Sequence, residues 1–178
     1  MFSINQRKKK KGQVWIETVI YTLIGLAIIG ILLASAKPKI DEIKDKLVIE
    51  QTIESLNNLD EKIYEVQRSP GNRRIVDFKI TKGVLGIDAQ EDSIVWLFES
   101  NYQYSEEGEP INLGSLELTT TKGNPWLINL TLDYAIDLQY EGNVDELKEF
   151  QKAPSPYQLY IENMGTQTGN IVVDIGER

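Results

Sequence analysis

The chain carries one long uncharged stretch near its amino terminus, and this stretch limits what the rest of the chain can fold into. Residues 18–36 contain no Asp, Glu, Lys or Arg and are mostly apolar. A run of roughly 20 apolar residues is about the length that crosses a membrane as a helix. The basic residues Arg7 to Lys11 precede it, and clustered positive charge stays on the cytoplasmic side. We therefore expect a single-pass membrane protein with a cytoplasmic amino terminus and with residues 38–178 outside.

Two places near this stretch have the composition of a processing site. Small residues at Ala34, Ser35 and Ala36 follow the apolar run, as in an ordinary secretory signal. The run is, however, longer than the roughly 7 to 15 residues of a signal-peptide core, and helical periodicity continues after it. The other place lies before the run, between Gly12 and Gln13.

The residues around Gly12 resemble the start of archaeal type IV pilin-like proteins with class III signal peptides. In that family the signal peptide ends in a basic run plus Gly, Gln often comes first in the mature chain, and its fifth residue is Glu. Here Lys11, Gly12, Gln13 and Glu17 stand at those places. The resemblance is specific for residues 1–36. Within it, Trp15 stands where a small hydroxyl residue is common, and Tyr21 stands where Leu is usual.

The resemblance implies a structural subunit, major or minor, of a type IV pilus-like surface filament. A prepilin-type peptidase of the membrane would cut between Gly12 and Gln13. The partners would be this peptidase, the membrane, and copies of the chain or other pilin-like subunits. The alternative is a single-pass surface protein whose external domain binds a ligand or partner.

Glu17 is the only charged residue between Val14 and Ala36. A carboxylate at the edge of an apolar span is costly unless it is paired, and such residues often have a function. In a filament, the new α-amino group of Gln13 on the same or a neighbouring subunit would pair with it and set the register. The alternative is that Glu17 lies among lipid headgroups and is hydrated.

The charge of the chain argues against one class of partner. The formal net charge is −8, and removal of residues 1–12 takes five of the 19 basic residues and none of the 27 acidic ones, which gives −13. Nucleic-acid binding needs clustered Lys and Arg. We therefore expect an acidic exterior and no nucleic-acid partner.

The residue inventory excludes several kinds of site. The chain has no Cys and no His. Disulfide frameworks, thiolate zinc sites, cysteine nucleophiles and Ser-His-Asp triads are therefore absent, as is the commonest general base. The acidic groups Asp88-Glu91-Asp92 and Glu106-Glu107-Glu109 have Ca²⁺-type ligands but match no known loop spacing. We expect no enzyme, no cofactor and no metal site.

A second helical segment follows the apolar run. From Lys39 to Gln67 the apolar residues recur mostly at steps of three and four, which predicts an amphipathic helix. Pro38 should kink or interrupt the helix at its start, and Ser69 to Asn72 should end it. Ile49 and Leu59 lie off any single coiled-coil seam.

After Gly71 the pattern alternates with period two, which predicts strands. The expected elements are a hairpin of 75–80 and 84–87, a central strand at 93–99, a strand from Tyr102, a long strand at 126–141 bent near Tyr134, a short helix at 143–150, and strands at 157–161 and 171–175. The fold class is therefore α+β, with a long amino-terminal helix and an antiparallel β-rich head of sandwich or curved-sheet type. The expected parts are a signal peptide at 1–12, a membrane and filament-core helix at 13–36, an amphipathic helix at 37–69 and an external head at 70–178.

The long alternating run contains one modification motif. Asn129-Leu130-Thr131 is an N-glycosylation sequon, and both Asn129 and Thr131 fall on the polar face, in the half of the chain predicted to be outside. We predict Asn129 as a glycosylation site. Asp133 and Asp137 share this face but lie roughly 13 Å apart along a strand, too far for the about 5 to 9.5 Å of glycosidase carboxylates. We interpret them as a solvated face.

Overall fold

The computed structural model describes residues 8–178, with side chains from Val14 onward. The described residues form one helix followed by ten strands. The helix is α1 (Lys8–Gln67), and the strands are β1 (Arg73–Phe78), β2 (Val84–Asp88), β3 (Ser93–Ser100), β4 (Ile111–Leu113), β5 (Leu116–Thr121), β6 (Trp126–Asp133), β7 (Asp137–Tyr140), β8 (Leu147–Gln151), β9 (Tyr157–Gln167) and β10 (Asn170–Glu177). This confirms the α+β class, with a long apolar helix ahead of a β-rich region.

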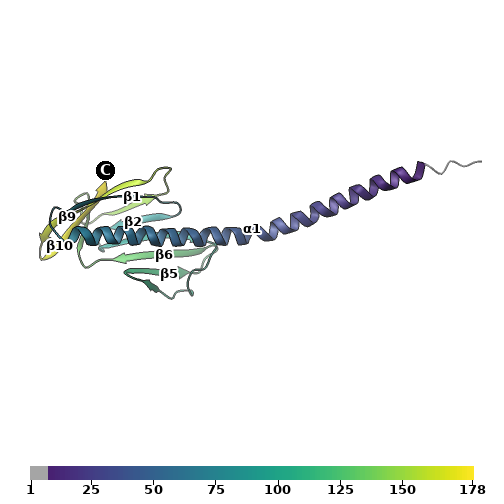
Figure 1. Cartoon of the computed structure of the whole chain (residues 1–178). Helices are drawn as coiled ribbons and strands as arrows, with labels where there is room; N and C mark the ends of the chain where they lie inside the picture. The colour runs from purple at the N-terminus through teal and green to yellow at the C-terminus, as the bar shows by residue number, and fades with distance from the viewer. Residues whose placement is uncertain (1–7) are drawn as a thin grey trace, which may run out of the picture. The chain divides into compact units, whose positions relative to one another are not determined.

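The chain divides into two compact units, residues 1–41 and 42–178. We call the second unit the head. The helix α1 crosses the boundary, so that its last turns belong to the head, where the strands of both sheets lie along it (Figure 1).

The helix is longer and less interrupted than the sequence predicts. α1 stays helical through Pro38, which lies inside it, so this residue does not interrupt the helix, and the other expected effect, a kink, stays a prediction. The end of α1 agrees with the prediction: Gly71 adopts a φ of 75°, which other residues rarely do, and its N–H donates to the Asn163 carbonyl at 2.7 Å.

The strands of the head form two sheets. The six-stranded sheet has the order β4-β5-β6-β3-β2-β8, and every pair in it is antiparallel. The four-stranded sheet has the order β1-β9-β10-β7, in which only β10 and β7 run parallel. The strand at 93–99 was expected to be central, and β3 does lie between β6 and β2.

One core joins both sheets to the helix. The residues of α1 that are buried in the head recur at alternating steps of four and three: Asp45, Ile49, Thr52, Leu56, Leu59, Ile63 and Val66. We call this set the buried stripe. Its apolar members belong to the same hydrophobic cluster as Trp96 of β3, Leu130 of β6 and Ile161 of β9. The head is therefore built around the carboxyl-terminal part of α1.

Four local expectations were wrong. β1 pairs with β9 in the four-stranded sheet, whereas β2 pairs with β3 and β8 in the other sheet, so residues 75–87 form no hairpin. Residues from Tyr102 form no strand, and residues 147–151 are the strand β8 instead of a helix. The run at 126–141 does break near Tyr134, but there it passes from one sheet to the other.

The buried stripe yields the first prediction. Leu56 is fully buried, whereas Leu47 on the same helix is 51% exposed. Leu56→Ala should lower the free energy of unfolding of the head by about 2–5 kcal/mol, because it removes buried methyl groups and leaves a cavity. Leu47→Ala is the matched control and should cost less than about 0.5 kcal/mol. Urea denaturation of both variants in detergent, followed by Trp fluorescence, measures the difference. Equal losses would contradict this assignment of faces.

Candidate functional site

The most unusual surface of the chain is the amino-terminal part of α1. Its large apolar side chains from Val14 to Leu33 are all between 40% and 74% exposed. Within the described residues, this helix is long and apolar enough to cross a membrane, and its apolar run is not buried in the structure. In water such a surface is costly, at roughly 25 cal/mol for each Å² of apolar area. The segment is thus suited to lipid or to other apolar helices.

Three hydroxyl side chains in and just after this segment are bonded to the helix itself. The Thr18 hydroxyl donates to the Val14 carbonyl at 2.9 Å, and the Thr22 hydroxyl donates to the Thr18 carbonyl at 2.8 Å. The Ser35 hydroxyl does the same with the Leu32 carbonyl at 3.0 Å. These groups can therefore enter an apolar medium without losing a partner.

Glu17 is exposed on α1 and is the one charged side chain of the segment. The predicted cleavage point, between Gly12 and Gln13, would make Glu17 the fifth residue of the mature chain. The backbones of Gly12 and Gln13 belong to α1, but their side chains lie outside the described ones. Cleavage between them, and pairing of Glu17 with a new amino group, therefore stay predictions.

The exposed apolar surface of α1 continues past the uncharged run. Ile40, Ile43 and Leu47 are 49%, 59% and 51% exposed, and they recur at steps of three and four. Residue 47 lies about 200° around the helix from Asp45, so this row faces away from the buried stripe. The helix therefore has two apolar rows in this region, of which the head covers only one.

A buried charge cluster fixes the start of the buried stripe. The Asp45 side chain is only 10% exposed and accepts from Lys82 Nζ at 2.6 Å, from the Asn101 backbone N–H at 2.7 Å and from Asn101 Nδ2 at 2.8 Å. Burial by itself raises the pKa of the Asp45 carboxyl, but the bonds from Asn101 and Lys82 outweigh it and hold the pKa below its usual value. The Lys82 carbonyl in turn accepts from Trp96 Nε1 at 2.9 Å. The cluster joins helix, strand and loop in one polar network.

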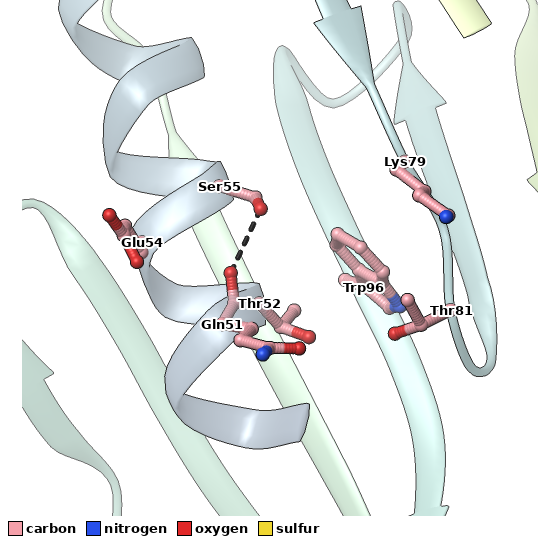
Figure 2. Close-up of a pocket in the computed structure, with 7 residues that line it drawn as sticks. All are labelled: Gln51, Thr52, Glu54, Ser55, Lys79, Thr81 and Trp96. Carbon is pink, nitrogen blue, oxygen red and sulfur yellow. Dashed lines mark hydrogen bonds between the residues drawn. The ribbon is translucent and has the colours of Figure 1, made fainter. Parts of the chain in front are cut away.

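A groove of about 240 Å³ lies between α1 and the strands (Figure 2). Gln51, Thr52, Glu54 and Ser55 form the helix side, and Lys79, Thr81 and Trp96 form the strand side. The Ser55 hydroxyl donates to the Gln51 carbonyl at 2.8 Å, and the Trp96 indole N–H is bonded to Lys82. The lining residues offer no nucleophile held by a base, so the groove has no arrangement for covalent catalysis.

A second hollow, of about 310 Å³, lies near the end of α1 and contains Asp60 and Tyr134. The Ser115 hydroxyl donates to Asp60 Oδ2 at 2.5 Å. The Tyr134 hydroxyl is buried without a hydrogen-bond partner, and burial, followed by the nearby Asp60 carboxylate, raises the pKa of this phenol above its usual value. Tyr134 therefore stays protonated and cannot act as a base near neutral pH.

Two members of the first acidic group, Asp88 and Asp92, accept hydrogen bonds from backbone N–H groups of the head. Asp88 Oδ1 accepts from the backbone N–H groups of Gln90 and Glu91 at 3.0 and 3.2 Å, and Asp92 Oδ1 accepts from the Leu138 N–H at 2.8 Å. Within residues 8–178, no group of three or more Asp or Glu side chains is placed to hold a metal ion. Asp133 and Asp137 do not share one strand, because they belong to β6 and β7 in different sheets.

Asn129 lies in the middle of β6, opposite Leu97 of β3 on one side and Thr119 of β5 on the other. Its strand neighbours Ile128 and Leu130 are buried in the core, whereas Asn129 and Thr131 are partly exposed. The sequon side chains therefore face away from the core, as the alternation predicts. Nothing in this geometry tests whether Asn129 is modified.

The comparisons with known proteins give no identification. No protein-family model matches the chain, and no curated protein or solved structure is significantly similar to it.

The Asp45 cluster predicts a specific pH dependence. The folded pKa of Asp45 lies below the unfolded value of about 4. The stability that the ionised carboxylate contributes is therefore complete above about pH 4 and is lost as the pH falls through the folded pKa. Asp45→Asn should lower the free energy of unfolding at pH 7, and its difference from the unmodified chain should shrink below about pH 4. Urea titrations at several pH values measure this, with the exposed Asp145→Asn as control. An Asp45→Asn difference that is constant with pH would contradict the assignment.

The exposed helix predicts a labelling pattern. Because the chain has no cysteine, single cysteines report their surroundings. Leu26→Cys, at a position 61% exposed on the helix, should resist a water-soluble maleimide in membranes and react after denaturation. Asn57→Cys, exposed on the head, should react on intact cells. Equal reaction at both positions in intact membranes would mean that Leu26 is not in lipid.

Proposed function

We propose that the chain is a structural, pilin-like subunit of a surface filament, made as a single-pass membrane protein and assembled through the first part of α1. Its partners would be a prepilin-type peptidase, the membrane, and copies of itself or related subunits. The head would lie outside the cell and carry no catalytic site. The proposal includes no cofactor and no nucleic-acid partner.

One observation carries this proposal: from Val14 to Leu33 the helix is exposed on every side, with a single carboxylate near its start. An ordinary anchor needs only such a run and no charge within it. A carboxylate at Glu17, close behind the Gly12-Gln13 junction, is explained if an amino group is created beside it. Charge pairs of this kind can fix register even where they add little stability.

The continued apolar row at Ile40, Ile43 and Leu47 also supports assembly. Membrane anchoring alone does not require exposed isoleucine and leucine side chains beyond the apolar run. Exposed apolar rows of this kind commonly mark contacts with another protein. Other subunits would cover this row and the apolar run before it.

The first experiment determines the intact mass and amino-terminal sequence of the protein purified from its native membranes. A chain that begins at Gln13 is the expected result, and it means that a prepilin-type peptidase processes the protein. A chain that still begins at Met1 would remove the basis for assembly. The alternative would then stand: an anchored surface protein whose head is a binding module, with the groove of Figure 2 as the first surface to test.

A pair of variants separates processing from assembly. Glu17→Gln keeps the shape of the side chain but removes its charge, so the chain should still be cut after Gly12. The association constant of a subunit contact should fall about tenfold, the equivalent of about 1.4 kcal/mol, and filament yield should fall with it. Glu61→Gln is the control, because it removes the same charge from an exposed position of α1 within the head and should leave assembly unchanged. Normal filaments from Glu17→Gln would exclude the proposed role of this carboxylate.

A further inference from the structure

The outer face of the six-stranded sheet carries an apolar strip that nothing in the head covers. Its members come from β2, β3, β6 and β8 and are Val84, Val95, Leu97, Leu127 and Leu147. Leu97 is 42% exposed and Leu147 is 57% exposed. The solvent face of an antiparallel sheet is normally polar. This strip therefore needs an explanation that the assembly helix does not provide.

Leu97 stands at the centre of the strip. A groove of about 330 Å³ on one side runs over Gly86 toward Leu147, and a hollow of about 350 Å³ on the other runs toward Leu127. Both are lined by Leu97. The residue paired with Leu97 on the neighbouring strand β6 is Asn129. The sequon residue Asn129 is therefore the cross-strand neighbour of the one described residue that lines both hollows.

The orientation of the Asn129 amide favours attachment of a group from outside. Its Oδ1 is buried and has no hydrogen-bond partner, whereas its Nδ2 is absent from the buried, unpaired atoms and bonds to no described residue. The side chain as a whole keeps part of its surface exposed. A substituent on Nδ2 would therefore break no hydrogen bond within the described residues.

The charged residues around the strip limit what kind of group can cover it. Asp88 and Glu149 line one hollow, and Glu99 lines the other beside the single basic residue Lys82. A second head packed face to face would bring these carboxylates together, and like charges across an interface are costly. A neutral polyhydroxylated group with apolar C–H faces has no such cost.

We propose that Asn129 carries an N-linked oligosaccharide whose first sugars lie over the apolar strip on both sides of Leu97. The sequence has no other Asn-X-Ser/Thr sequon. The proposal rests on the outer location of the head in the proposed function. In this arrangement the glycan shields the exposed leucines from water and from other heads, in keeping with the solubilising effect of surface glycans.

The transfer itself requires a lipid-phosphate-linked oligosaccharide and a membrane transferase. Asn129 Nδ2 attacks the anomeric carbon of the donor sugar, so that an N–C bond forms. The bond between that carbon and the phosphate oxygen breaks, the lipid phosphate leaves with the electron pair, and Nδ2 loses one proton.

The first test is the mass of the tryptic peptide 123–148 from the full chain purified from its native membranes. A hexose- or N-acetylhexosamine-bearing mass at Asn129 is expected. It should be lost in Thr131→Val, which removes the sequon, and kept in Thr131→Ser, which preserves it. If Thr131→Val does not fold, Asn129→Gln serves instead. An unmodified peptide overturns the proposal. The same sample also reports the amino terminus of the chain. A chain that is cut at Gln13 but unmodified would overturn the glycan proposal and leave the proposed function standing. A chain that is uncut but modified would overturn the proposed function and leave the modification of Asn129 standing.

The second test asks where the sugars lie. A cysteine at Leu97 should react with a bulky maleimide several-fold more slowly in the glycosylated chain than in the same chain with Thr131→Val. Asp77→Cys, on the four-stranded sheet, is the control and should react equally in both. If Asn129 is modified and Leu97→Cys reacts at the same rate with and without Thr131→Val, the sugars do not cover the strip.

Discussion

The contact between one face of α1 and two sheets organises the head. The apolar members of the buried stripe, from Ile49 to Val66, belong to the same core as both sheets. A small β-rich unit gains much of its stability from apolar area removed from water. Without the stripe, the inner faces of the sheets would lose a continuous part of that area. The head therefore depends on residues that precede its first strand.

The same helix has a second surface with the opposite property. From Val14 to Leu33 its apolar side chains are exposed, and Ile40, Ile43 and Leu47 extend this exposure on the side away from the buried stripe. The apolar residues of one row of α1 are thus buried inside the head, whereas the apolar residues of the other row are exposed. Asp45, bonded to Lys82 and Asn101, holds the first row in register. Because the two rows are separate, the head can fold while the surface proposed for assembly stays exposed.

The sequence predicted the parts of the fold that local patterns determine. Period-two alternation located β3, β6, β9 and β10, and the Ser69–Asn72 turn chemistry located the end of α1. It did not predict partners that lie far apart in the chain: β1 follows α1 directly but pairs with β9, and this depends on the core and not on the turn at Lys82–Gly83. The strand β8 was missed because Asn143 and the acidic residues after it resemble a capped helix, and pairing with β2 overrides that local preference.

The candidate sites divide in the same way. The exposed helix and Glu17 follow from composition, and the outward direction of Asn129 follows from alternation. The buried stripe followed only in part: the steps of three and four predict its apolar members from Ile49 to Val66, whereas the polar members Asp45 and Thr52 do not fit an apolar pattern. With polar residues at those places, Ile49 and Leu59 appear in the sequence only as apolar residues that lie off any single coiled-coil seam. A polar residue can stand in a buried row only if its partners are supplied, and Asn101, which bonds Asp45, lies far along the sequence. The spacing of 45, 49, 52, 56, 59, 63 and 66 was the available clue.

The buried stripe also determines how the head would bear mechanical load. In the proposed filament, tension would enter each subunit through the helix. Because the stripe runs along the helix axis, an axial pull loads all of its contacts at the same time, in shear, and Asp45 at its start would share that load with the apolar side chains. A sideways pull on the same helix would instead open the contacts one after another, as in peeling. The fold is therefore expected to be strongest along the direction in which a fibre is stretched and weakest across it.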